Sequence, residues 1–165
     1  MLVAACAPGP APEPDPATKQ AWADRWCSAV ADAEAALGTV PPAADLAEPA
    51  AVRGQLTTYL AGLAERLTRS VTALAGLGAA PIAGGDRVTQ VALESLRGAH
   101  DQVAAAQATL TSGDSPDLVA EALAKVVPVV ADFDPAAPLA GVPGSDFTRW
   151  AERAANCARL PALGH

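Results

Sequence analysis

Apolar residues recur every three or four positions over most of the chain, which is the pattern of helices that bury one face. The longest stripe falls between residues 48 and 77 and consists of Leu56, Leu60, Leu63, Leu67, Val71, Leu74 and Leu77. Another helix is predicted at residues 17–37, with a shared face formed by Trp22, Trp26, Val30, Ala33 and Leu37. No segment shows the strict alternation of a β-strand, so the pattern predicts an all-α protein.

Three further helices are predicted beyond residue 85. One spans residues 86–110 and carries two overlapping apolar stripes, one leucine-rich and one alanine-rich. The next starts after Ser115, and Pro128 is expected to kink it or end it near Val127, because proline lacks an amide donor and clashes one turn back. Residues 134–144 are expected to be an irregular loop, and a last helix runs from Ser145 to about Leu160. Together these segments predict an antiparallel bundle of four to five helices.

The N-terminal residues 1–16 differ from the predicted helical domain at residues 17–165. Val3-Ala4-Ala5-Cys6 resembles the end of a bacterial lipobox, where small residues precede a cysteine that is lipidated. Only five residues precede Cys6 and none is basic, so an unmodified cysteine stays open as the alternative. Proline at positions 8, 10, 12, 14 and 16 predicts a disordered, extended stalk.

The other two cysteines, Cys27 and Cys157, fall in predicted helices at opposite ends of the folded region. In an oxidising compartment such a pair most often forms a disulfide, which requires the first and last helices to pack together. Two buried thiols are the alternative. The chain has no Cys-x-x-Cys motif, so redox catalysis is not indicated.

Composition narrows the class of protein further. The 165 residues suit one domain, and 51% hydrophobic content is too high for disorder throughout. Aromatic residues make up only 4%, so the core must consist mainly of Ala, Leu and Val. The net charge of −7 argues against nucleic-acid binding, which depends on Lys and Arg neutralising phosphates. No apolar run approaches the ~20 residues of a spanning helix, so membrane contact is expected only through a lipid anchor.

Few residues offer catalytic or metal-binding chemistry. His100 lies close to an apolar stripe and is interpreted as a partly buried histidine, with a haem ligand as the alternative. Asp132 and Asp134 supply too few oxygens for a calcium loop. The tryptophans are interpreted as core residues, with a sugar- or haem-stacking surface as the alternative. No metal site or cofactor is therefore expected.

Arginines form the one group that indicates a catalytic alternative. The predicted second and third helices carry Arg66, Arg69, Arg87, Gln90, Glu94 and Arg97. Exported all-helical chorismate mutases hold a dicarboxylate with converging Arg and Lys side chains, together with Glu and Gln. No lysine lies on these two helices and no family motif matches residue by residue, so solvated surface charges are the expectation.

The lipobox-like segment, the Pro-rich stalk and the Ala/Leu-rich body with two further cysteines resemble small exported proteins and lipoproteins of actinobacteria. The resemblance implies a cell-envelope location and no particular activity. We therefore expect a non-enzymatic, extracytoplasmic binding or interaction module, secreted or anchored through Cys6, whose partner is a protein or a small hydrophobic ligand. The alternative is a carrier of haem or lipid between the second, third and fourth helices, which requires an apolar cavity of roughly 300 Å³ or more.

Overall fold

The computed structural model describes residues 13–39, 49–135, 137–140 and 145–160, and these residues form helices and turns with no strand among them. In chain order the elements are α1 (Pro16–Leu37), α2 (Pro49–Ala75), α3 (Gly85–Thr111), α4 (Asp117–Ala131), α5 (Ala137–Ala140), α6 (Phe147–Ala151) and the 3-10 helix η1 (Ala155–Arg159). The predicted all-α class is confirmed. Cys6 and the lipobox-like segment lie outside the described residues.

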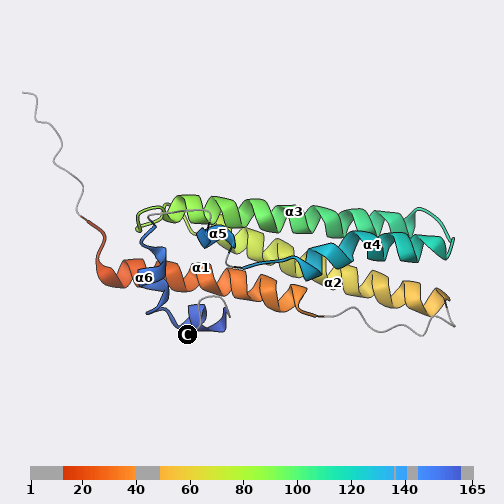
Figure 1. The fold of residues 1–165 in the computed structure, drawn as a ribbon, viewed down its shortest axis with the longest axis horizontal. Helices are drawn as coiled ribbons and strands as arrows, with labels where there is room; N and C mark the ends of the chain where they lie inside the picture. The colour runs from red at the N-terminus through yellow and green to blue at the C-terminus, as the bar shows by residue number, and fades with distance from the viewer. Residues whose placement is uncertain (1–12, 40–48, 136, 141–144, 161–165) are drawn as a thin grey trace, which may run out of the picture.

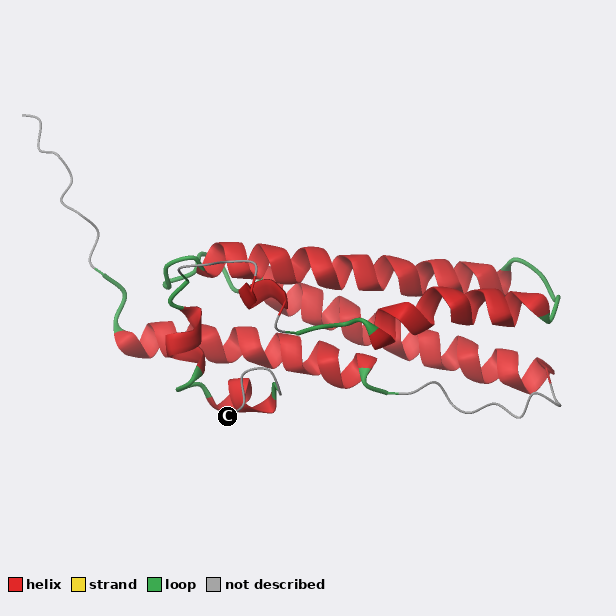
Figure 2. Ribbon diagram, viewed as in Figure 1, coloured by secondary structure: helices red, strands yellow, loops and turns green. Residues whose placement is uncertain are grey.

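The four long helices lie side by side and alternate in direction (Figure 1). α2 packs against both α1 and α3, and α3 packs against α4, so the predicted antiparallel bundle is confirmed. Short helical segments and turns make up the rest of the described chain (Figure 2). Among these, α6 and η1 return to the first helix and pack against α1.

Side-chain and backbone caps explain where α1 begins and ends. Asp15 accepts a hydrogen bond from the backbone N–H of Thr18 at 3.0 Å, which satisfies a donor that the first turn leaves open. Pro16 follows at the first helical position, where its missing N–H costs nothing. At the other end, Gly38 donates its N–H to the carbonyl of Glu34 at 2.7 Å, which closes the last turn.

The leucine stripe of α2 forms the centre of the core. Its buried members are Leu56, Leu60, Leu63, Leu67 and Leu74. On α3 the alanine-rich stripe is buried throughout, together with Leu96 and Leu110 of the leucine-rich stripe. The members of the alanine-rich stripe are Val88, Ala92, Ala99, Val103 and Ala106. Leu93 is only partly buried. This broad apolar face agrees with the contacts that α3 makes with both α2 and α4.

The proline in α4 does not end the helix. α4 continues through Pro128 to Ala131, so of the two expected outcomes, a kink or an end near Val127, the end is wrong. The carbonyl of Ala124 loses its usual partner at Pro128, but Ala124 is exposed and water can replace that partner. Val126, two residues before the proline, is fully buried, and Asp132 donates its N–H to the carbonyl of Pro128 at 2.8 Å. These contacts hold the last turn in place.

The C-terminal segment is not the single helix that the sequence predicts. α6 ends at Ala151, Ala154 is extended (φ −97°, ψ 124°), and η1 follows. The break has a physical cause, because the backbone N–H of Asn156 donates to the side chain of Asp24 instead of continuing an α-helix. The predicted irregular loop at residues 134–144 likewise contains the short helix α5.

Candidate functional site

A disulfide between Cys27 and Cys157 joins α1 to η1. The Sγ atoms lie 1.99 Å apart and the Cα atoms 4.9 Å apart, and both residues are buried. The predicted pairing is confirmed, and the last segment packs beside the first helix as that pairing requires. The bond joins positions 130 residues apart, so it constrains most of the unfolded chain.

Polar contacts on both sides of the disulfide fix the C-terminal segment against α1. The carboxylate of Asp24 accepts hydrogen bonds from the backbone N–H and the side-chain amide of Asn156, each at 2.8 Å. Arg159 forms an ion pair with Asp32 at 2.9 Å. The segment therefore engages one carboxylate before Cys27 on α1 and one after it.

Aromatic side chains pack the interior next to this attachment. The ring of Phe147 lies edge-on to those of Trp22 and Trp26, with centroids 6.2 Å and 4.6 Å away. All three residues are buried, and Trp150 is only 6% exposed. The tryptophans thus belong to the core, and these four rings offer no exposed stacking surface.

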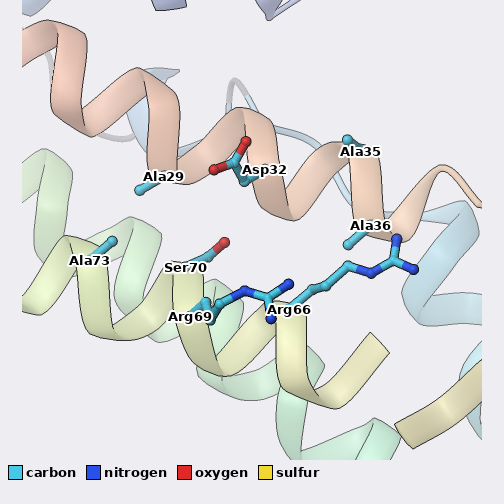
Figure 3. A pocket seen from close by; sticks show the side chains of 8 residues that line it. All are labelled: Ala29, Asp32, Ala35, Ala36, Arg66, Arg69, Ser70 and Ala73. Carbon is cyan, nitrogen blue, oxygen red and sulfur yellow. The ribbon is translucent and has the colours of Figure 1, made fainter. Parts of the chain in front are cut away.

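A cleft lies between α1 and α2, with a volume of about 330 Å³ (Figure 3). We call it the α1–α2 cleft and define it by its lining residues, which are Ala29, Asp32, Ala35, Ala36, Arg66, Arg69, Ser70 and Ala73. Small alanine side chains on both helices leave the space open, and the polar groups come from Asp32 on α1 and from three residues of α2.

The charged groups of the α1–α2 cleft differ in how they are paired. Asp32 forms the ion pair with Arg159, and Arg69 bonds Glu65 of its own helix at 2.5 Å. Arg66 has neither an ion pair nor a hydrogen bond with any other residue of the described ranges. One exposed guanidinium at the cleft is therefore without a protein partner in the part of the chain described.

Ser70 carries the second unpartnered polar group of the α1–α2 cleft. The residue is only 2% exposed, and its hydroxyl oxygen forms no hydrogen bond. In Figure 3 the hydroxyl points from α2 into the space between the two helices. Most threonines of the same bundle return their hydroxyl bond to a carbonyl one turn back, as Thr68 and Thr72 do on α2. Ser70 does not.

The members of the predicted arginine group that belong to α3 lie outside the α1–α2 cleft. Arg87 donates to Gln90 at 3.2 Å, and Gln90 donates to Glu94 at 3.1 Å, along an exposed face of α3. Arg97 is also exposed, and none of these four residues lines the α1–α2 cleft. The structure thus places the two arginines of α2 together but does not bring Arg97 and Glu94 to them.

Two other residues singled out in the sequence, His100 and Asp132, lie at or near the surface of the bundle. The side chain of His100 is 36% exposed and its Nδ1 lies 3.4 Å from Asp101. Asp132 is an exposed residue at the end of α4, beside a cavity of about 190 Å³ between α3 and α4. Within the described ranges, no three His, Cys, Asp or Glu side chains gather in a way that could hold a metal ion.

Burial shifts the pKa of two groups near the end of α1. It raises the pKa of Glu34 above its usual value, because desolvation disfavours the charged carboxylate. Burial also raises the pKa of Tyr59, and this effect outweighs the opposing effects of its contact with Thr39 and of the Arg66 charge. The Tyr59 hydroxyl donates to the carbonyl of Thr39 at 2.8 Å, so it ties α2 to the turn after α1.

No protein-family model, curated protein or solved structure matches this chain. None of the helices in the described ranges combines the length and the apolar character needed to cross a membrane.

Proposed function

We propose that the protein is a non-enzymatic binding or interaction module that works outside the cytoplasm, in the cell envelope. The Cys27–Cys157 disulfide is the observation that carries this proposal. Disulfides persist in oxidising compartments and are reduced in the cytosol, so a buried structural disulfide favours export. The lipobox-like Val3-Ala4-Ala5-Cys6 and the Pro-rich stalk support an acyl anchor at Cys6, in the style of actinobacterial lipoproteins.

Fold geometry supports binding over catalysis. The bundle is fixed at its first helix by the disulfide and by the flanking contacts of Asp24 and Asp32. A rigid helical scaffold with an open cleft suits recognition, since sites on helices are held more precisely than sites on loops. An enzyme of the chorismate-mutase type would need Arg97 and Glu94 to meet Arg66 and Arg69, and neither Arg97 nor Glu94 lines the α1–α2 cleft.

The carrier alternative rests on the space between the helices. The cavity between α3 and α4 has about 190 Å³, which is less than the roughly 300 Å³ that a small-molecule site needs. The larger α1–α2 cleft is lined by two arginines, an aspartate and a serine, which do not suit a wholly apolar ligand. A more open hollow of about 600 Å³ is lined, among the described residues, by α2 alone, so it is not the space between three helices that the carrier requires. The binding module therefore remains the better proposal.

Native mass spectrometry of the protein purified from its own cells tests this function. The proposal expects the protein in the envelope or medium fraction, with the mass of the disulfide form and, for an anchored protein, an acylated Cys6. Recovery from the cytosol with reduced Cys27 and Cys157 would contradict it. A tightly retained hydrophobic molecule in the native spectrum would favour the carrier instead.

A further inference from the structure

Two groups that line the α1–α2 cleft lack a partner in the protein, and in Figure 3 the Arg66 side chain runs along the cleft toward Ala36 while the Ser70 hydroxyl lies farther along α2. Arg66 presents a guanidinium with no ion pair or hydrogen bond in the described part of the chain, and Ser70 presents a buried hydroxyl with none. Both side chains come from α2 and lie four residues apart, so they share one face of the helix. Figure 3 shows this face turned toward α1 across the cleft.

The acidic groups around the cleft are already engaged. The carboxylate of Asp32 is held by Arg159, which the disulfide-linked η1 brings to α1. Glu65 engages one nitrogen of the Arg69 guanidinium, and a guanidinium has five N–H donors. Donors of Arg66 and Arg69 therefore remain available, although the protein as a whole carries a net charge of −7.

An unpartnered buried hydroxyl indicates a missing acceptor or donor. Nearly all buried polar side-chain atoms in folded proteins have a partner, and an exception is explained by strain, function or a bound molecule. Ser70 is 98% buried and its hydroxyl oxygen is covered from solvent, yet the residue lines the cleft, so its side chain must rotate toward the cleft for a bound molecule to supply the missing partner. The hydroxyl has one proton to donate to such a ligand.

We propose that the α1–α2 cleft binds a small molecule through an oxyanion group, a carboxylate or a phosphate. This inference rests on the proposed function as a binding module and names its ligand chemistry. Planar guanidinium groups match the oxygens of both anions, and the Ser70 hydroxyl donates a further hydrogen bond. Alanines 29, 35, 36 and 73 accommodate the body of the ligand, and about 330 Å³ suits a small metabolite.

Calorimetric titration of the full chain with disulfide intact tests the site. Inorganic phosphate and succinate serve as soluble probes at low ionic strength, and vesicles containing phosphatidylglycerol test an anionic lipid headgroup as the source. Saturable one-site binding is expected for a soluble probe or for the vesicles, and Arg66→Ala should weaken it at least tenfold. Arg97→Ala removes the same charge from an exposed position on α3 and should change it less than twofold.

Two results would overturn the proposal. One is the absence of saturable binding with both soluble probes and with the vesicles. The other is an equal loss in Arg66→Ala and Arg97→Ala, which would reveal only general charge attraction. Both are measured on purified protein, so they are independent of the cell fraction and disulfide state that test the proposed function.

Ser70→Ala separates a binding role from a structural one. The variant loses the hydroxyl but keeps the small side chain, so affinity for the probe should fall several-fold. The melting temperature of the free protein should stay the same or rise, because a buried hydroxyl without a partner has been removed. An unchanged affinity together with a lower melting temperature would contradict the assignment of Ser70 to the site.

Discussion

Replacing Cys27 and Cys157 together with alanine is expected to lower the free energy of unfolding of the bundle strongly. The disulfide joins positions 130 residues apart, and in the chain-entropy relation a loop of that length corresponds to about 5 kcal/mol at 25 °C. For a domain of this size, that free energy corresponds to a fall in melting temperature of roughly 10–20 °C. The effect arises in the unfolded chain, because without the bond the segments around residues 27 and 157 are free to separate and the unfolded state gains conformational entropy.

Thermal unfolding followed by circular dichroism measures this change. The wild-type protein after full reduction is the matched control, since it loses the bond but keeps both side chains. It should melt close to the double variant, and the non-reduced wild type should melt well above both. Equal melting temperatures in all three samples would refute the reasoning.

Two further predictions concern single side chains. Gly85→Ala should destabilise the folded protein by about 1–3 kcal/mol, because the new Cβ would lie 2.6 Å from the Cβ of Ala80 and 3.1 Å from Trp22. Gly98→Ala on the same helix is the control, since its new Cβ meets no atom within 4 Å and should stabilise the protein by about 0.5–1 kcal/mol. Opposite shifts in urea midpoint are the test. The raised pKa of Glu34 means that the folded state holds its proton more tightly, so stability falls as pH rises from the ordinary glutamate range through that raised pKa. Glu34→Gln should therefore raise the melting temperature more at pH 7 than at pH 4, and an equal change at both would contradict this.

The long helices were predictable because local patterns and tertiary packing agree in them. The leucines of α2 recur at helical spacing, and the same residues fill the core. On α3 periodicity alone allowed two stripes, and the choice between them depends on how α2 and α4 are placed. The sequence could therefore define the helix but not which of its faces is most buried.

Segments shaped by distant contacts were harder to predict. Residues 147–160 show a continuous helical spacing of apolar positions, yet the chain breaks at Ala154. Asp24, more than 130 positions away, binds the N–H of Asn156, and no local signal carries that information. The continuation of α4 past Pro128 similarly depends on solvent exposure and on the anchoring of Val126, which the proline signal alone does not reveal.

The candidate site was only partly visible in the sequence. Arg66 and Arg69 belonged to the wider arginine group of the catalytic alternative, while solvated surface charges were the expectation, and the members of that group on α3 do not line the α1–α2 cleft. Asp32 and Ser70 were missed. Ser70 did leave a signal, because it falls three residues after Leu67 and four before Leu74, a polar residue on the strongest apolar stripe. The role of Asp32 follows only from the fold, which brings Arg159 to it.

The account depends most on the Cys27–Cys157 bond forming where the protein works. Rapid alkylation of thiols in intact native cells, followed by peptide mass spectrometry without reduction, measures this directly. The account predicts one joined species that contains the peptides of both Cys27 and Cys157, with neither cysteine alkylated. Full alkylation of both cysteines at the earliest time point in folded protein would contradict it.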